Sequence, residues 1–180
     1  MELVDIYDER HKKLGYVKER RKLSEGEFKL SCFAFIINDD DEILVQQRLK
    51  TAKHYPNLWS PTSGACDTGE DNLACIKREI KEELGLDVFY KDIRYIGNYA
   101  RTNDFVEVFL VKSNVSIDEV TIQEEEVQAV KWMKINDYIN LMNNGEASDT
   151  GFYVFKYYYD NYYNKCVEFE DGMPISIDLI

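Results

Sequence analysis

The chain has 180 residues, the size of one domain with a substantial core, and its 44% hydrophobic content indicates a folded protein. A net charge of −12 argues against general nucleic-acid binding, and no apolar run is long enough to cross a bilayer. We therefore expect neither a nucleic acid nor a membrane as a partner.

The first segments predict an N-terminal extension with two short strands, at residues 2–6 and 15–17, joined by a turn. A basic cluster follows at residues 18–22. This cluster is either a solvated surface that balances an acidic chain or a patch that faces phosphate or a partner. The sequence leaves both interpretations open.

A β-hairpin is predicted at residues 29–37 and 42–48, because both runs lack strand breakers and are rich in aliphatic or aromatic residues. The turn between them consists of asparagine and aspartate, and a loop from Leu49 to Trp59 follows the hairpin. Further extended segments are expected at residues 60–63, 88–90, 93–101, 104–112 and 127–133.

One long helix is predicted between these strands. Leu73, Ile76, Ile80 and Leu84 recur every three or four residues and define an apolar stripe that begins after Asp71. Gly85 supplies the expected C-terminal stop. The stripe predicts that this helix packs against the sheet along one face.

Two further helices are expected near the C-terminal end. The first is predicted to be capped by Asn136 and to run through Met142, before a break at residues 143–145. The second covers the aromatic run at residues 152–163. Its tyrosines serve for packing or form a face between subunits, so the sequence is compatible with a homodimer.

We interpret residues 1–180 as a single domain with an N-terminal extension (1–28), a core (29–143) and a C-terminal helix and tail (144–180). Strands on either side of one long helix, followed by further helices, predict an α+β fold arranged as an α/β/α sandwich.

The cysteines do not suggest a metal site by their spacing. Cys32, Cys66, Cys75 and Cys166 contain no C-x-x-C pair, and the chain has only two histidines. The first residues are also not those of a signal peptide. We therefore expect reduced thiols in a cytoplasmic protein, with Cys66 serving for packing.

Three carboxylates on the long helix are the strongest indication of chemistry. Glu79, Glu82 and Glu83 stand at i, i+3 and i+4, so their side chains gather on one flank of the helix. Like charges repel there, whereas a hard divalent cation with oxygen ligands would neutralise them. The alternative is a solvated acidic face, and the carboxylates alone do not decide between the two.

A longer pattern surrounds these carboxylates. A glycine is followed, after five intervening residues, by a glutamate and, after seven more, by R-E-aliphatic-x-E-E-x-G-aliphatic. Together they form one uninterrupted signature: Gly64, Glu70, Arg78, Glu79, Ile80, Glu82, Glu83, Gly85 and Leu86. This segment resembles the signature of the Nudix hydrolases at every defined position. The resemblance implies a sandwich around a mixed sheet. It also implies Mg²⁺-dependent hydrolysis, with Mn²⁺ as a substitute, of a diphosphate in a nucleoside diphosphate derivative or related small molecule.

The same resemblance implies roles for individual residues. Glu82 and Glu83 become the main metal ligands, and Glu79 becomes a further ligand or the base that orients water. Arg78 would hold Glu79 by an ion pair. The carbonyl of Gly64 would be another ligand, at a point where the lack of a side chain permits close approach.

Two other acidic positions rank below these. Glu70 matches the first glutamate of the signature, which supports the junction of loop and helix and in some members the metal site. Many family members also use an acid from the loop before the last strand. Here that loop contains Glu124, Glu125 and Glu126, and either Glu125 or Glu126 is expected to contribute unless the loop is simply an exposed acidic one.

Residues 1 to about 90 also resemble the Nudix subgroup related to isopentenyl-diphosphate isomerase. In that subgroup an arginine at the end of the hairpin and a lysine in the following loop grip the diphosphate, and Arg48 and Lys53 match them. The isomerase cysteine and its neighbouring histidine, however, have no counterpart between Trp59 and Gly64. Hydrolase is therefore favoured over isomerase.

A non-catalytic module that binds a nucleotide is the third possibility. Sensors of this fold usually lose glutamates of the signature, and all of them are present here. The complete signature therefore favours catalysis.

Overall fold

The computed structural model describes residues 2–52, 55–163, 169–170 and 173–174. Its helices are α1 (Asn72–Leu84), α2 (Ile135–Asn143) and α3 (Phe152–Asn161), with short 3₁₀ turns at Tyr90–Asp92 and Ile117–Glu119. The strands are β1 (Leu3–Tyr7), β2 (Lys13–Glu19), β3 (Lys29–Ile37), β4 (Glu42–Arg48), β5 (Trp59–Ser60), β6 (Thr62–Ala65), β7 (Ile93–Ala100), β8 (Asp104–Lys112), β9 (Val127–Lys134), β10 (Phe169–Glu170) and β11 (Met173–Pro174).

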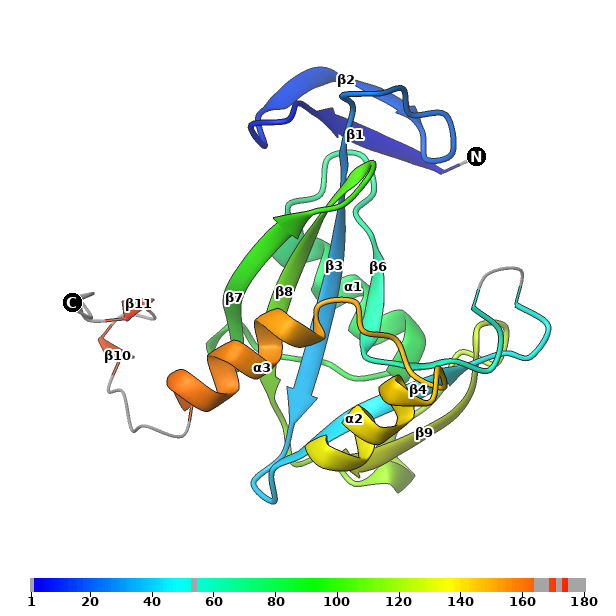
Figure 1. The fold of residues 1–180 in the computed structure, drawn as a ribbon, viewed down its shortest axis with the longest axis vertical. Helices are drawn as coiled ribbons and strands as arrows, with labels where there is room; N and C mark the ends of the chain where they lie inside the picture. Colours follow the sequence, from blue (N-terminus) through cyan, green and yellow to red (C-terminus); the bar gives the residue numbers. More distant parts are fainter. Residues whose placement is uncertain (1, 53–54, 164–168, 171–172, 175–180) are drawn as a thin grey trace.

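A mixed sheet of seven strands forms the centre of the molecule (Figure 1). Its path is β5-β4-β3-β8-β7, with β6 paired to β3 and β9 paired to β4. The pairing of β3 with β8 is parallel along the whole of β3, while the other pairs in this sheet are antiparallel. The strands β3 and β4 pair only beside their turn. Beyond it they separate, so β6 lies next to β3, and β5 and β9 lie next to β4.

Helices cover both faces of this sheet, which confirms the predicted sandwich (Figure 1). The alternation of side chains along β3 explains the two cores. Phe33, Phe35 and Ile37 belong to the core that includes residues of α2 and α3, whereas Ala34 and Ile36 belong to the core that α1 covers.

The helix α1 begins and ends where the sequence predicts. The side chain of Asp71 accepts a hydrogen bond from the amide of Ala74 at 2.7 Å, which caps the first turn. Gly85 has φ of +71° and donates its N–H to the carbonyl of Lys81. A left-handed residue at this position suits glycine, because it has no Cβ to clash.

Three sequence-based expectations are wrong in detail. Asn136 does not cap α2, because β9 runs through Lys134 and the helix starts at Ile135, whose side chain is buried. The extended piece expected at 88–90 is partly replaced by the 3₁₀ turn Tyr90–Asp92. The last aromatic helix ends at Asn161 and not at Tyr163, because the backbone angles of Tyr162 are no longer helical.

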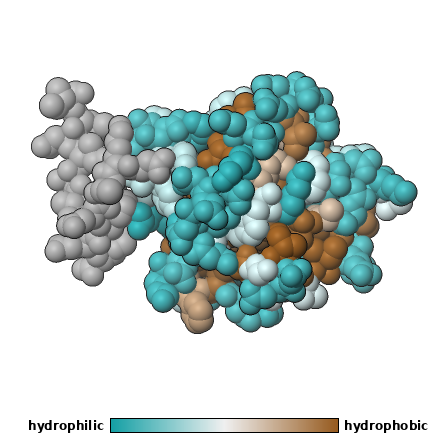
Figure 2. All heavy atoms as spheres, turned by 90° about the horizontal axis from the view of Figure 1, so that it is seen from below, coloured by the Kyte–Doolittle hydropathy of each residue, from teal (hydrophilic) through white to brown (hydrophobic). Residues whose placement is uncertain are grey.

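The predicted N-terminal extension is a separate antiparallel sheet made by β1 and β2, at the top of Figure 1. Its second strand is longer than the segment expected at 15–17. The face of the molecule in Figure 2 is mostly hydrophilic, with apolar side chains gathered in patches between polar ones. Among the described residues, no helix combines the length and the apolar character needed to span a membrane.

Candidate active site

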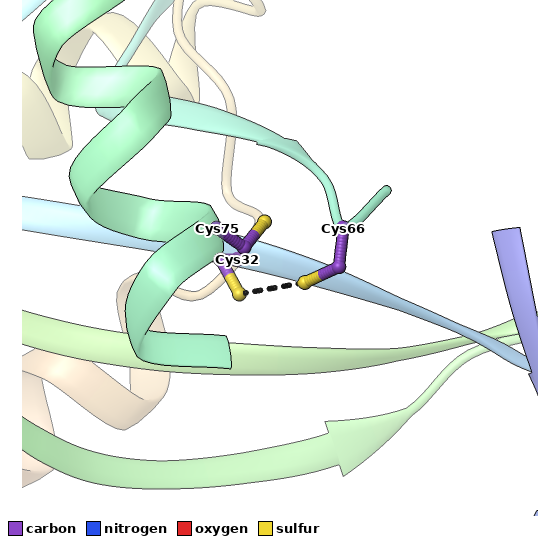
Figure 3. A group of neighbouring side chains, drawn as sticks. All are labelled: Cys32, Cys66 and Cys75. Atoms are coloured by element: carbon purple, nitrogen blue, oxygen red, sulfur yellow. Dashed lines mark hydrogen bonds between the residues drawn. The ribbon is translucent and has the colours of Figure 1, made fainter. Parts of the chain in front are cut away.

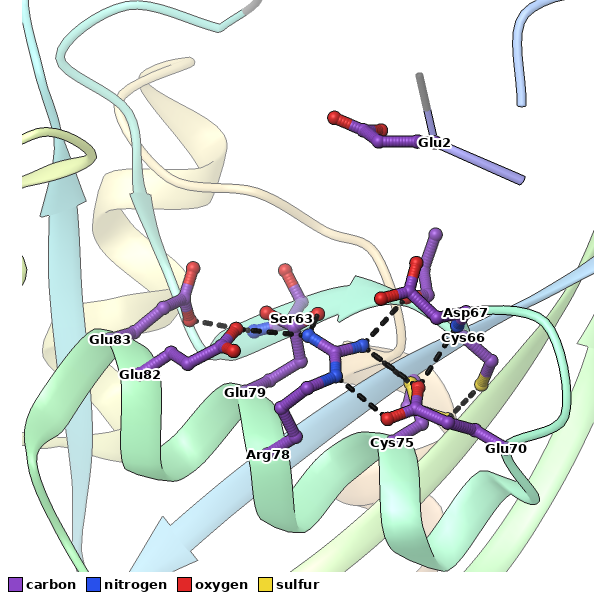
Figure 4. Close-up of polar contacts among 12 residues, drawn as sticks. Glu2, Ser63, Cys66, Asp67, Glu70, Cys75, Arg78, Glu79, Glu82 and Glu83 are labelled. Atoms are coloured by element: carbon purple, nitrogen blue, oxygen red, sulfur yellow. Dashed lines mark hydrogen bonds and ion pairs between the residues drawn. The ribbon is translucent and has the colours of Figure 1, made fainter. Parts of the chain in front are cut away.

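Three glutamates of α1 project toward strand β6 (Figure 4). They differ in their contact with solvent: the side chain of Glu82 is 51% exposed and that of Glu79 is 13% exposed, while Glu83 is 3% exposed as a residue. The helical spacing therefore gathers the three carboxylates, as expected, and the neighbouring strands decide how deeply each one lies.

Strand β6 contacts two of these carboxylates through its backbone. The amide of Ser63 donates to Glu83 Oε2 at 3.2 Å. A Cβ atom added at Gly64 would collide with the carboxylate of Glu79. Glycine at this position thus lets the strand backbone approach the helix, and the Gly64 position predicted from the signature lies against the glutamates.

Arg78 ties the loop before α1 to the helix (Figure 4). It donates to both oxygens of Glu70, at 2.8 and 2.9 Å, and to the carbonyl of Ala65 at 3.1 Å. Its other contacts are ion pairs with Glu79 at 2.7 Å and with Glu82 at 3.0 Å. The ion pair with the guanidinium therefore holds the carboxylate of Glu79 in one orientation. The two bonds to Glu70 hold the guanidinium itself in place.

Burial makes ionisation difficult for two of the glutamates. It raises the pKa of Glu79 to about 7, although Arg78 acts in the opposite direction. It raises the pKa of Glu83 to about 8, against the hydrogen bond from Gln46. Both carboxylates thus sit in a setting that disfavours negative charge unless a cation joins them.

The donor set fits a hard divalent cation such as Mg²⁺ or Mn²⁺. All three helix side chains offer carboxylate oxygens, which such cations prefer. Gln46 donates to Glu83 at 2.7 Å, while its own side-chain oxygen is buried and accepts no hydrogen bond among the described residues. The lone pairs of this oxygen add a further uncompensated negative partial charge near Glu83, which favours binding of a cation.

The acidic loop before β9 contributes one charge to this site. The negative charge of Glu126 is among the causes that raise the pKa of Glu83. Glu125 and Glu126 are both exposed, and Glu125 is not among those causes. Of the two acids that the sequence leaves open, the electrostatic effect on Glu83 therefore favours Glu126.

A cleft of about 830 Å³ opens beside β6. Ser63 and Gly64 line it, so the cleft reaches the strand that contacts the glutamates. Its walls also carry basic and aromatic side chains: Arg20, Lys29, Arg48, Arg101, Tyr55, Tyr99 and Tyr153. Arg48 therefore lines the cleft that reaches the strand beside the glutamates. Lys53, the other predicted contact, lies outside the described residues.

Sequence reasoning did not identify several of these residues. Gln46 reaches Glu83 only because β4 lies beside the end of α1, and Ser63 acts through its backbone amide, which carries no sequence signal. Arg20 belongs to the basic cluster at residues 18–22, for which the sequence does not distinguish a solvated surface from a patch that faces phosphate or a partner. Arg20 lines the cleft and also pairs with Glu2 at 3.0 Å, while Lys18 and Lys22 pair with Glu27 and Glu19.

Comparison with known proteins decides the family. A model described as the NUDIX domain matches residues 27–153. The chain belongs to the Nudix family. An uncharacterised Nudix hydrolase of Listeria monocytogenes is 28% identical over 148 residues, which are 81% of this chain and 88% of that protein. An isopentenyl-diphosphate Delta-isomerase of Ruegeria pomeroyi is 30% identical over 115 residues, which are 58% of this chain and 62% of that protein.

Solved structures show the same fold. The crystal structure of DR0079 from Deinococcus radiodurans has a TM-score of 0.71 at 18% identity, covering 86% of this chain and 98% of that chain. The Nudix domain of NrtR from Shewanella oneidensis, solved with ADP ribose, has a TM-score of 0.53 at 18% identity and covers 68% of this chain and 82% of that chain. At this identity the likeness establishes the Nudix fold.

Family members generally hydrolyse diphosphates with a divalent metal. In this Nudix protein the glutamate flank, the glycine of β6 and the basic cleft all meet at residues 63–64. The cleft and the carboxylates therefore adjoin the same two residues of β6.

Proposed function

We propose that this protein hydrolyses a phosphoanhydride in a nucleoside diphosphate derivative or a related small diphosphate, with Mg²⁺ and with Mn²⁺ as a substitute. The observation that carries the proposal is the double role of β6. Ser63 and Gly64 line the basic cleft on one side and contact Glu83 and Glu79 on the other.

Glu79, Glu82 and Glu83 would hold the cation, together with the carbonyl of Gly64. When bound, it supplies charge neutralisation for the phosphates and makes a water molecule more acidic. Arg78 keeps the Glu79 carboxylate in one orientation through their ion pair. Glu79 is then placed to orient the attacking water or to accept its proton.

The cleft supports an anionic substrate that carries a larger group. Arg48, at the end of β4, and Arg20, from the N-terminal extension, provide positive charge along its wall. Tyr55 and Tyr153 are 71% and 72% exposed and also line the cleft, so their rings are accessible to a planar or apolar leaving group. A net charge of −12 makes these local cations necessary, because the overall field repels a diphosphate.

An isomerase of the isopentenyl-diphosphate type is the alternative, since one relative carries that name. The thiol of Cys66 is the nearest in sequence to the position of the isomerase cysteine. It is 4% exposed, faces Cys32 and is not among the residues that line the cleft. This position disfavours a role in proton transfer to a bound isoprenyl group.

The deciding experiment is a substrate survey with the purified protein. Nucleoside diphosphates, nucleotide sugars, dinucleoside polyphosphates, coenzyme A and isoprenyl diphosphates are each incubated with Mg²⁺ or with a chelator. We expect release of phosphate or nucleotide from at least one class, only with the metal. Rearrangement of isopentenyl diphosphate without hydrolysis of any compound would instead establish the isomerase, and binding without turnover would establish a sensor.

A further inference from the structure

Three of the four cysteines come together at the N-terminal end of α1 (Figure 3). Cys32 lies on β3, Cys66 follows β6 and Cys75 lies on α1. Their sulfur atoms all lie within 4.8 Å of one another, and the Sγ atoms of Cys32 and Cys66 are 3.4 Å apart. All three thiols are free and buried.

The fold, and not the sequence spacing, creates this cluster. Antiparallel pairing of β6 with β3 brings Cys66 beside β3, where its amide donates to the carbonyl of Leu30 at 3.1 Å. Cys75 lies one turn into α1 and faces the sheet together with Ile76. Intervals of 34 and 9 residues match no metal-binding motif, which is why the sequence predicted scattered thiols.

The surroundings act differently on the three thiols. Hydrogen bonds among the thiols and burial raise the pKa of Cys32 and Cys75, whereas the hydrogen bonds from these two thiols lower the pKa of Cys66. Cys75 Sγ is 4.0 Å from Nη2 of Arg78, whose charge is permanent. Cys75 also lies in the first turn of α1, near the end of the helix where the dipole is positive. Buried cysteines often serve only as small apolar side chains. Here, however, the three sulfurs face one another beside a cation.

We propose that Cys32, Cys66 and Cys75 form a site for a soft monovalent cation, with Cu⁺ as the ion that fits best. Soft thiolate ligands select Cu⁺ and Zn²⁺ over harder metals. Structural Zn²⁺ almost always takes four ligands, and no fourth histidine, cysteine or carboxylate joins this group among the described residues. Cu⁺ accepts three sulfur ligands, so the ligand number favours it.

Binding would exchange protons for the ion without any redox step. Each thiol that becomes a ligand releases its proton to solvent. Cys32 would also give up its contact with the carbonyl of Asn72, which lies 3.3 Å from its sulfur. Cys66 is 4% exposed, whereas Cys32 and Cys75 are fully buried, so an ion would meet Cys66 first.

The site is tested in protein that carries Cys166→Ser, so that only the three clustered thiols remain. Reduced protein is titrated without oxygen with Cu⁺ against a coloured Cu⁺ chelator. We expect one ion per chain. Loss of any one ligand, in Cys32→Ala, Cys66→Ala or Cys75→Ala, should weaken binding by about 100-fold or more, since even residues that only orient a ligand are worth 10- to 100-fold.

A matched control keeps the number of thiols but moves one away. Ala74 is exposed, so Ala74→Cys combined with Cys75→Ala places the third thiol on the outside of α1. This variant should bind as weakly as Cys75→Ala. Equal binding by the control and the parent, or copper held entirely by the chelator, would overturn the proposal.

A second measurement needs no cysteine variant of the cluster. X-ray absorption of the Cu⁺-loaded Cys166→Ser protein should show three sulfur neighbours and no nitrogen or oxygen. Two sulfurs or a mixed set would overturn the three-thiolate site. Hydrolysis with Mg²⁺ does not enter either readout, so the two proposals succeed or fail separately.

Discussion

Glu83 shows how a carboxylate is prepared for a cation at the scale of one residue. It is 3% exposed and is held by Gln46 at 2.7 Å and by the amide of Ser63 at 3.2 Å. Both groups donate to the same carboxylate oxygen, Oε2. Among the described residues, no cationic side chain forms an ion pair with Glu83. The other oxygen is thus left for a ligand of opposite charge.

The first prediction concerns this carboxylate. Glu83→Gln keeps the size of the side chain and removes its charge, so cation binding and transition-state stabilisation should both suffer. We expect kcat to fall about 10²–10³-fold, which corresponds to roughly 3–4 kcal/mol. The measurement is steady-state hydrolysis of the best substrate over a range of Mg²⁺ concentrations.

Two neighbouring acids provide matched controls for that variant. Glu126→Gln should reduce the affinity for Mg²⁺, because the charge of Glu126 acts on Glu83, whereas Glu125→Gln should behave as the parent. Wild-type kcat in Glu83→Gln would remove Glu83 from the active site. A larger effect of Glu125 than of Glu126 would reverse the choice between the two loop acids.

The second prediction concerns pH in the absence of metal. Burial raises the pKa of Glu79 to about 7 and of Glu83 to about 8, from an ordinary value of 4.5. Between pH 4.5 and these raised values, the two carboxyl groups have lost their protons in the unfolded chain but still hold them in the folded protein. The contribution of these two groups to the free energy of unfolding should therefore be fully present below about pH 4.5 and be lost as the pH rises toward 8, on the order of a few kcal/mol.

This window is separate from that of Glu70, whose pKa the hydrogen bonds from Arg78 lower. Urea unfolding of chelator-treated protein between pH 5 and pH 8.5 measures the slope. Glu83→Gln should flatten it, and Mg²⁺ should restore stability at the alkaline end by favouring the ionised carboxylates. A stability that rises across this window would contradict the raised pKa values.

Sequence reasoning at this scale succeeded where the position of a side chain follows from helical spacing. The intervals between Glu79, Glu82 and Glu83 place all three on one flank of α1, and the structure shows them there. Gln46 could not be found in the same way, because its contact with Glu83 depends on which strand lies beside the helix. Long-range pairing leaves no local pattern.

At the scale of elements, the approach of β6 to α1 organises the site. Ser63 and Gly64 belong to a strand of four residues that pairs with β3. The absence of a side chain at Gly64 sets the distance between that strand and Glu79.

The third prediction follows from this approach. Gly64→Ala would drive a methyl group into the Glu79 carboxylate, so the strand and the helix must separate or Glu79 must turn away. We expect at least a tenfold loss of kcat/KM and weaker Mg²⁺ binding, since misplaced catalytic groups lose about two orders of magnitude per ångström. Kinetics and calorimetric titration with Mg²⁺ measure the two effects.

Ser63→Ala is the control, because it keeps the backbone amide that donates to Glu83. Its Mg²⁺ affinity should match that of the parent. If Gly64→Ala binds Mg²⁺ and turns over normally, the close approach has no functional role.

Elements with strong local signals were predicted well and those with weak signals were not. The β3 and β4 hairpin and β8 have the predicted bounds, since uninterrupted apolar runs indicate buried strands. Asn136 was taken as a helix cap because of its residue type alone. The structure starts α2 one residue earlier, because β9 leads into it without a loop.

At the scale of the whole molecule, the N-terminal extension is attached to the signature segment. The amide of Thr68 donates to the carbonyl of Leu3 at 3.1 Å, and the amide of Gly69 donates to the Asp5 carboxylate at 2.8 Å. These contacts hold β1 against the loop that precedes α1. Arg20, which follows β2, is thereby brought to the wall of the cleft.

The sequence predicted the layers of the molecule but not the position of the extension. Alternation along the strands and the apolar stripe of α1 define which faces are covered. The resemblance supplied the topology. The docking of this two-stranded sheet depends on backbone bonds between distant segments and on the burial of Val4 and Ile6, and neither composition nor periodicity shows where these contacts form.

The last prediction uses two adjacent arginines in the extension. Arg20 and Arg21 are both exposed, but only Arg20 lines the cleft. A diphosphate in the cleft should gain from the charge of Arg20 and hardly from that of Arg21, because exposed charges act over short distances in salt solution. We expect Arg20→Ala to raise KM about tenfold, in keeping with about 1.5 kcal/mol for a bond to a charged group, and to leave kcat close to the parent value.

Arg21→Ala removes the same charge from the same extension, so it controls for the change in net charge. Its KM should equal that of the parent at physiological ionic strength. Arg48 also lines the cleft, so Arg48→Ala should likewise raise KM more than it lowers kcat. Equal KM values for Arg20→Ala and Arg21→Ala would mean that the extension acts only through its general charge. A fall in kcat alone would place Arg20 in the chemical step and not in substrate binding.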